Sequence, residues 1–306
     1  MYENLKLQKR DYIVVILAII GLIYLFSPAI YGQDLKLLHE KTFQTSPGKK
    51  LTVEGSSGDI IITTWDKSEA FVKISCNDNA LEKMQFKMEL VDDGILVKGE
   101  RKSTDWFSNI RVKYEVIIPS KYSVYAKTSG GDINIKNVDG KIELNTSGGD
   151  IDVQSSVGKL NGKTSGGDID IKNQNGDVDV KTSGGDITLI GIKGDVNCKT
   201  SGGDIDITSN FGKINGSTSG GDITLDYSGP NKGVELSTSG GDIKILVPSD
   251  FGAKAELKTS GGKVSCNLNT SNVVEIKSTK FEADLNNGGA PLICKTSGGS
   301  ILVKKK

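Results

Sequence analysis

The chain has 306 residues, with 38 Lys and Arg against 38 Asp and Glu, so its formal net charge is zero. Only 36% of the residues are hydrophobic and 6% aromatic, which is too little for one large globular core. The balanced charge argues against nucleic acid as a partner, because neutralising phosphates needs a clustered basic surplus. The single histidine, His39, argues against imidazole catalysis and multi-histidine metal sites, so the composition indicates a protein that is not an enzyme.

Residues 1–33 have the features of an export signal. Lys6, Lys9 and Arg10 precede a nearly unbroken apolar run over residues 12–26, and the small residue Gly32 closes the segment. This order is typical of a secretory signal peptide cut after Gly32. An uncleaved signal anchor is the alternative, since residues 12–30 are just long enough to span ~30 Å of hydrocarbon. Either way the rest of the chain is predicted to be extracytoplasmic, and a membrane is touched only through an uncleaved N-terminal helix.

Residues 34–127 are predicted to form an irregular β region that caps the N-terminal end of a repeat array. Strands are expected at residues 51–53, 59–63, 71–76, 84–90, 95–98 and 112–118, where polar and apolar residues alternate. Trp65, Phe86, Trp106 and Phe107 concentrate in this region. Such a cap covers the core and the unpaired backbone that an open end would expose.

A tandem repeat dominates residues 128–306. Identical copies of Thr-Ser-Gly-Gly-Asp-Ile follow one another at intervals of 18 residues, the last interval being 20; they begin at Thr128, Thr146, Thr164, Thr182, Thr200, Thr218 and Thr238. Degenerate copies begin at Thr259 and Thr296, and Ser278 stands where a further copy is expected. An outlying relative, Gly-Ser-Ser-Gly-Asp-Ile, begins at Gly55. This regularity predicts that one structural unit is built many times over.

Each 18-residue unit has two halves, such as residues 164–172 and 173–181, in which four turn-forming residues precede a five-residue alternation. Period-two alternation predicts a β-strand with one buried face. A fixed period without a helical pattern predicts a β-solenoid whose coils stack about 4.8 Å apart. We therefore expect an all-β fold, namely a β-solenoid with two strands per 18-residue coil, continuous with the cap. The spacing of left-handed hexapeptide helices is missing, so the predicted solenoid is right-handed.

A strand that ends in proline, a short link and then the repeated motif occur at residues 117–128 and again at residues 246–259. Together with the tandem motif, this arrangement resembles the toast-rack family DUF4097, bacterial exported proteins described as adhesins, over about residues 51–303. The resemblance implies an extracytoplasmic, adhesin-like domain of repeated β-strands. Other members accompany envelope-stress systems. The family has no agreed catalytic residues, so the resemblance assigns none to this chain.

One aspartate of each hexapeptide is expected to stack on the next, and the carboxylates then need compensation. One interpretation is a calcium column, since hard oxygen ligands suit that ion. The alternative is that each carboxylate accepts backbone N–H groups of its own turn, with Lys163, Lys181 and Lys199 adding neutralisation. The missing glycine spacing of calcium-binding β-rolls favours this alternative, and no other cofactor is predicted. The aspartates are Asp132, Asp150, Asp168, Asp186, Asp204, Asp222 and Asp242.

The Thr and Ser columns that begin at Thr128 and Ser129 would present hydroxyls along one edge. We expect them to stabilise the ladder, with binding of a glycan or envelope polymer as the functional alternative. Cys76, Cys198, Cys266 and Cys294 are an even number, which suggests disulfides in an exported protein. Their spacing predicts free thiols instead. Cys198 and Cys294 would lie more than five repeats, or near 25 Å, apart, while Cys266 and Cys294 come closer across the core.

These observations support three functional hypotheses. The first is an exported, non-enzymatic, adhesin-like binding or structural module of the bacterial envelope or surface, making multivalent weak contacts. The second is an accessory of envelope-stress signalling, anchored in the membrane by an uncleaved N-terminal helix. The third is a β-helix carbohydrate-active enzyme using acid pairs such as Asp150 with Asp152 or Asp168 with Asp170. The regular coils that carry these acids indicate a scaffold rather than a cleft.

Overall fold

The computed structural model describes residues 35–102 and 109–306. The predicted signal segment, residues 1–33, and the cap residues Trp106 and Phe107 lie outside the described residues. The chain divides into two compact units, Met1–Asp34 and Leu35–Lys306, and the second contains all described residues. No helix in these described ranges is long and apolar enough to cross a membrane.

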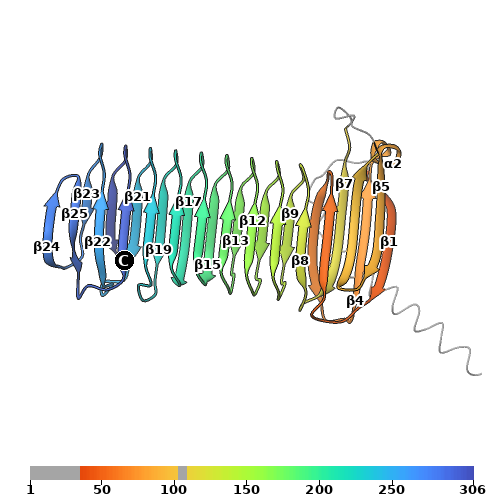
Figure 1. Ribbon diagram of the computed structural model, residues 1–306, viewed down its shortest axis with the longest axis horizontal. Helices are drawn as coiled ribbons and strands as arrows, with labels where there is room; N and C mark the ends of the chain where they lie inside the picture. The colour runs from red at the N-terminus through yellow and green to blue at the C-terminus, as the bar shows by residue number, and fades with distance from the viewer. Residues whose placement is uncertain (1–34, 103–108) are drawn as a thin grey trace, which may run out of the picture. The chain divides into compact units, whose positions relative to one another are not determined.

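The second unit is a stack of strands in two sheets (Figure 1). Sheet A contains, in spatial order, β1 (Lys36–Gln44), β4 (Glu69–Cys76), β7 (Val112–Pro119), β3 (Asp59–Trp65), β9 (Ile133–Lys136), β11 (Ile151–Gln154), β13 (Ile169–Lys172), β15 (Ile187–Lys193), β17 (Ile205–Phe211), β19 (Ile223–Tyr227), β21 (Ile243–Val247), β27 (Ile301–Lys305) and β23 (Val264–Cys266).

Sheet B contains, in the opposite spatial direction, β24 (Thr270–Lys277), β25 (Lys280–Leu285), β22 (Ala253–Lys258), β26 (Pro291–Lys295), β20 (Val234–Ser237), β18 (Ile214–Ser217), β16 (Val196–Lys199), β14 (Val178–Lys181), β12 (Leu160–Lys163), β10 (Ile142–Asn145), β8 (Ser123–Lys127), β2 (Lys50–Gly55), β6 (Gly94–Arg101) and β5 (Met84–Val91). The short helix α2 (Asp78–Lys83) was not expected from the sequence. The predicted all-β solenoid is confirmed, and its right-handedness stays a prediction.

Each 18-residue coil contributes one strand to each sheet, as predicted. In one coil, Ile169 and Ile171 of β13 and Val178 and Val180 of β14 are all buried between the sheets. Neighbouring coils pair in parallel without a register shift here, so that Ile169 lies between Ile151 and Ile187. The core is therefore a set of aliphatic rows, and a low hydrophobic content suffices because every coil uses only a few side chains.

At both ends of the stack the coils depart from chain order. This differs from the expectation that each coil stacks on the one before it in the chain. At the N-terminal end, the coil of β2 and β3 lies between that of β6 and β7 and that of β8 and β9. At the C-terminal end, the final coil of β26 and β27 lies between that of β20 and β21 and that of β22 and β23. The strands near Gly55 are thereby placed directly beside the first regular coil.

Antiparallel strands close both ends. β1 and β4 extend sheet A beyond β7, and β5 pairs with β6, so the predicted N-terminal cap is present. A second cap at the C-terminal end was missed, because residues 278–281 were interpreted as a degenerate coil. Lys280 instead begins β25, which pairs antiparallel with both β22 and β24.

The four cysteines are free, as predicted, but the distance argument changes. Cys198 lies in β16 and Cys294 in β26, with only β18 and β20 between them. Three strand spacings place the two residues about 14 Å apart rather than 25 Å, still beyond disulfide reach. Burial raises the pKa of the Cys198 thiol to about 12, so it stays protonated.

The inserted C-terminal coil can be tested with engineered disulfides in a background where Cys266 and Cys294 are alanine. Ser237 pairs with Lys295, and Lys295 also pairs with Lys258. Ser237→Cys with Lys295→Cys should oxidise, because neighbouring parallel strands lie about 4.8 Å apart. Ser237→Cys with Lys258→Cys should stay reduced, since the two sites are about two spacings apart. Mass spectrometry of the oxidised proteins detects which disulfide has formed. A crosslink only between positions 237 and 258 would show that the coils follow chain order instead.

Candidate functional site

The repeated turn between sheet B and sheet A is held by its threonine. Thr164 is buried, and its Oγ1 donates a 2.8 Å hydrogen bond to the carbonyl oxygen of Gly149 in the preceding coil. The same Oγ1 accepts the N–H of Gly167 in its own turn at 3.3 Å. The donated bond recurs at 2.6–2.9 Å in all nine copies of the motif. The threonines therefore stabilise the stack, as expected from the sequence, and their hydroxyls do not belong to an exposed row.

The aspartates bond to the next coil rather than to their own turn, which corrects the turn-capping interpretation. Asp150 Oδ1 accepts the backbone N–H of Asp168 at 2.8 Å, and Asp168 Oδ1 accepts that of Asp186. The series runs at 2.7–3.1 Å from Asp59 through the seven predicted aspartates to Ser300. The hydroxyl of Ser300 then accepts the N–H of Lys263, and the ladder ends there.

The second glycine of the motif allows the turns to approach this closely. A Cβ built on Gly167 would clash with the backbone carbonyl of Gly149 below it, and the same clash recurs at this position in the other copies. A Cβ on the first glycine, Gly166, would make only an ordinary contact, 3.6 Å from the carbonyl oxygen of Gly148. The two adjacent glycines thus have different roles, although the sequence repeats both.

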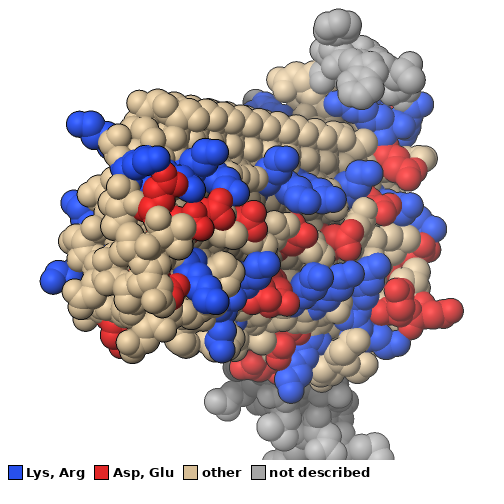
Figure 2. Space-filling view, turned by 60° about the vertical axis from the view of Figure 1, so that its left-hand side comes forward, with Lys and Arg blue, Asp and Glu red and all other residues tan. Residues whose placement is uncertain are grey.

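The exposed part of each turn is the serine and the first glycine. Gly166 N–H donates to the carbonyl oxygen of Ser147 in the preceding coil at 3.1 Å, and this backbone bond also recurs. Within the described ranges, the side-chain hydroxyls of these serines have no hydrogen-bond partner. We call this surface the Ser-Gly ridge; it comprises residues 129–130, 147–148, 165–166, 183–184, 201–202, 219–220, 239–240, 297–298 and 260–261. It forms the straight, uncharged strip along the upper edge in Figure 2.

Charged side chains flank the ridge on both sides. On sheet B, the residue before each threonine points outward and is often lysine; this basic row is Lys127, Lys163, Lys181, Lys199, Lys295 and Lys258. On sheet A, the aspartate after the two glycines points outward; this acidic row is Asp132, Asp150, Asp168, Asp186, Asp204, Asp222 and Asp242. Rows of Lys and of acidic residues are also visible below the ridge in Figure 2.

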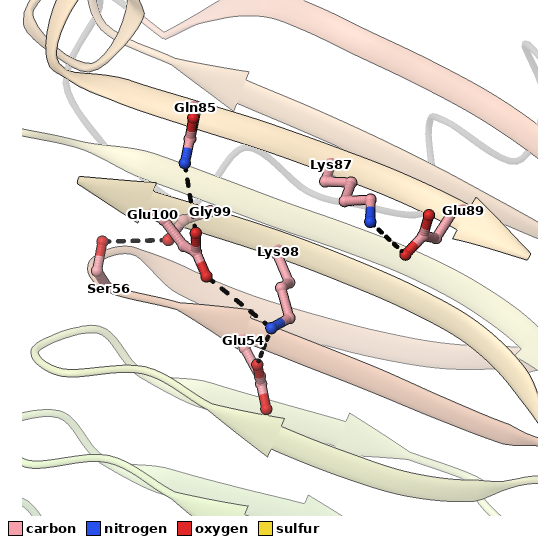
Figure 3. A network of polar contacts seen from close by, with 8 residues as sticks. All are labelled: Glu54, Ser56, Gln85, Lys87, Glu89, Lys98, Gly99 and Glu100. Carbon is pink, nitrogen blue, oxygen red and sulfur yellow. Dashed lines mark hydrogen bonds and ion pairs between the residues drawn. The ribbon is translucent and has the colours of Figure 1, made fainter. Parts of the chain in front are cut away.

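At the N-terminal end of sheet B, the outward charges are instead neutralised within the chain (Figure 3). Lys98 contacts Glu54 at 3.1 Å and Glu100 at 3.9 Å, and Lys87 contacts Glu89 at 2.7 Å. The bond from Lys98 to Glu54 raises the pKa of this lysine. This network, which the sequence analysis did not identify, marks the end of the repeated charge pattern.

The aspartate column does not form a compact metal site. No three His, Cys, Asp or Glu residues in the part of the chain that the structure describes are grouped to hold an ion. One carboxylate oxygen of each of the seven aspartates already accepts a backbone N–H. This bond explains why aspartate recurs at the same position in successive coils, without any need for calcium. Partial burial raises the pKa of Asp59, the first member of the ladder. The calcium column therefore stays a prediction.

The acid pairs lie on an open sheet face. Asp152 and Asp170 pair with each other across β11 and β13, pointing outward beside Asp150 and Asp168. Two shallow hollows lie elsewhere: one of about 330 Å³ is lined by Gly48 and residues 121–123 and 139–140, and one of about 510 Å³ by residues 44–46, 49, 90–92 and 94. Neither hollow is lined by these acids, so the described geometry offers them no cleft.

Comparison with known proteins identifies the family. The model of the family described as Toastrack DUF4097 matches residues 49–304. The chain belongs to the toast-rack family. The resemblance carried by the tandem motif is thereby confirmed, and no curated protein matches this toast-rack chain.

Crystal structures of two bacterial proteins, each described as a candidate adhesin, are similar to this toast-rack protein. The one from Bacteroides fragilis is 22% identical, covers 69% of this chain and 97% of its own, and gives a TM-score of 0.48. The one from Parabacteroides merdae is 17% identical, covers 70% and 97%, and gives 0.35. A candidate cell adhesion protein from Clostridium sporogenes is 14% identical, covers 89% and 100%, and gives 0.22.

The close approach at the second glycine predicts different effects of two neighbouring substitutions. Gly167→Ala should lower the free energy of unfolding by about 1–3 kcal/mol or more, because the new methyl group forces two coils apart. Gly166→Ala, the matched control, should change it by less than about 0.5 kcal/mol, as is usual for surface positions. Urea denaturation measures both. Equal effects would show that the turns do not rest on each other at Gly167.

The aspartate ladder predicts a stack that is stable without calcium. Because backbone N–H groups already compensate the carboxylates, adding a chelator should leave the melting temperature unchanged. Differential scanning fluorimetry with and without added calcium checks this. A melting temperature that falls with chelator and recovers with calcium would establish the ion column instead.

Proposed function

We propose that this toast-rack protein is an exported, non-enzymatic, adhesin-like module of the bacterial envelope or surface, whose Ser-Gly ridge makes multivalent contacts with a repetitive partner. The partner class that we propose is a glycan or an envelope polymer. The observation that carries the proposal is the row of exposed serine hydroxyls that lack hydrogen-bond partners within the described chain and recur at one spacing over nine coils.

A repetitive partner suits this surface for an energetic reason. One serine hydroxyl contributes only ~0.5–1.5 kcal/mol when it forms a hydrogen bond. A polymer held at the first contact presents its next unit at high effective concentration, so the weak contacts accumulate. The ridge has no deep pocket, which favours an extended partner over a small molecule.

The second function that we carry forward is an envelope-stress accessory anchored in the membrane. It is favoured by the apolar run over residues 12–30, which follows Lys6, Lys9 and Arg10. N-terminal sequencing of the protein from its own cells separates the two functions. A mature chain that begins near Gln33 supports the exported module, and a chain that retains residues 1–32 supports the anchored accessory.

The proposed ridge can be tested by removing hydroxyls without disturbing the turn. Ser165→Ala, Ser183→Ala and Ser201→Ala combined should weaken binding to immobilised peptidoglycan and neutral or anionic wall polysaccharides by about tenfold or more. The matched control removes three outward hydroxyls of sheet A with Thr188→Ala, Thr208→Ala and Thr224→Ala, and should bind as the unchanged protein does. Surface plasmon resonance gives the dissociation constants. Equal binding by both triple variants would contradict the ridge as the binding surface.

A further inference from the structure

The two charged rows beside the ridge lack counter-charges where the repeat is most regular. Among the described residues, no ion pair involves Lys163 or Lys199, and Lys181 contacts only Asp179, at 3.9 Å. None of the seven aspartates of the acidic row has an ion pair within 4.0 Å in the described ranges, and six of them are exposed. The ends of sheet B differ, because Glu54 pairs with Lys98 and Glu256 with Lys295. Charges that the chain leaves unpaired in repeated rows indicate a charged partner.

The rows also have a fixed geometry. Lys163 and Asp168 belong to the same coil and lie on opposite flanks of the ridge, and the next coils repeat this as Lys181 with Asp186 and Lys199 with Asp204. Both rows follow parallel strands, so both have the same spacing of about 4.8 Å. A partner that complements this surface must carry acid and base in two parallel rows at that spacing, separated by a neutral strip.

A second copy of this chain meets the requirement. We propose that two copies pair ridge to ridge around a two-fold axis that runs parallel to the stack. This rotation exchanges the flanks, so the basic row of each copy faces the acidic row of the other. Coils that carry both charges give Lys127 opposite Asp132, Lys163 opposite Asp168, Lys181 opposite Asp186 and Lys199 opposite Asp204, each twice. The inference goes beyond the proposed function, because it gives the ridge a second partner that would compete with a polymer for the same surface.

The charges also select this symmetry over its alternative. A two-fold axis perpendicular to the stack and in the plane of the ridges would place lysine against lysine and aspartate against aspartate, which is repulsive. The C-terminal coils limit the pairing, because Ser300 and Lys263 replace aspartate there while Lys295 and Lys258 continue the basic row. Ser217 and Ser237 stand where lysine would be needed opposite Asp222 and Asp242, so the charge pairing covers the coils from Lys127 to Asp204.

The ridge itself permits the close approach that such pairing needs. It consists of Ser and Gly without any larger side chain, so two ridges can meet with their backbones near each other. Each serine hydroxyl, such as that of Ser183, can donate to the equivalent serine of the second copy while accepting from another. Because every coil repeats the same groups, one correct contact aligns all the others.

The test is self-association of residues 34–306 and of the full chain, measured by sedimentation equilibrium. The unchanged protein should dimerise, and its dissociation constant should rise about tenfold or more between low and high salt, because salt screens exposed ion pairs. Lys163→Glu, Lys181→Glu and Lys199→Glu combined should abolish dimerisation. The matched control, Lys159→Glu, Lys193→Glu and Lys213→Glu, changes as much charge away from the ridge and should still dimerise.

The acidic row is tested by a substitution for which the chain itself offers a precedent. Asp168→Ser, Asp186→Ser and Asp204→Ser combined should weaken dimerisation about tenfold or more, whereas the ladder keeps an oxygen acceptor, as at Ser300. The triple Asp168→Asn, Asp186→Asn, Asp204→Asn protein also keeps an acceptor oxygen in the ladder and loses the same three charges, so its dimerisation should weaken to the same extent. Unchanged circular dichroism confirms that each variant is folded. Folded Asp→Ser and Asp→Asn proteins that dimerise as tightly as the unchanged protein overturn the inference.

The orientation of the copies is tested by a single cysteine on the ridge. In the parallel arrangement, Ser147→Cys lies against Ser147→Cys of the second copy and should form a disulfide-linked dimer. In an antiparallel arrangement it would lie near the far end of the array, and Ser147→Cys alone would not crosslink. A crosslink only in a mixture of Ser147→Cys with Ser297→Cys, the second serine from the other end of the ridge, therefore contradicts the proposed axis.

Binding of the same proteins to wall polysaccharide separates the two proposals. Dimerisation with the predicted charge dependence supports the inference whether or not a polymer binds. Polymer binding by a protein that stays monomeric at every salt concentration overturns the inference and leaves the proposed function intact. A protein that stays monomeric and binds no polymer overturns both.

Discussion

The stack depends on the direct contact of one turn with the turn below it. The second glycine of each motif lies against a carbonyl group, the threonine hydroxyl donates to that carbonyl, and the aspartate accepts the next backbone N–H. Three groups of one hexapeptide thus satisfy the backbone at the point where the chain reverses between sheets. A side chain in place of this glycine, or a residue without an acceptor oxygen in place of the aspartate, would separate the coils. The spacing of every row on the surface follows from this contact.

Much of this architecture could be predicted from the sequence, because the same pattern of turn-forming, polar and apolar residues recurs in every repeat. The 18-residue interval determines which residues are neighbours in adjacent coils, and the alternation in residues such as 169–172 determines which of them are buried. The direction of the aspartate bonds could not be predicted. A carboxylate beside a glycine-rich turn can accept either from its own turn or from the next coil, and only the stacking distance decides between the two.

The order of the end coils could not be read from the alternation either, since Ile-x-Ile and Val-x-Val pairs fit equally well beside any other coil. The chemistry of the ladder did contain one signal. A rung that has a neighbour on its far side needs an oxygen that accepts an N–H group, and Lys263 has none. Ser300 has one, so the coil of Thr296 can precede that of Thr259 in space, although it follows in the chain. The ion pair of Glu54 with Lys98 could not be predicted either, because the sequence does not show that β2 and β6 are neighbours.

The inserted coils separate the molecule into parts that differ in how folding can proceed. In the middle, each coil pairs with residues 18 positions away, and closing such a loop is fast. At the ends, Thr128 bonds to Gly58 and Thr296 to Gly241, contacts across 70 and 55 residues. These contacts close longer loops, at an entropic cost that grows with loop length. During synthesis, β20 and β21 therefore remain an exposed edge until β26 and β27 emerge. The final coil then fills a place between two coils that already exist, which makes the C-terminal end the last part of the stack to become complete.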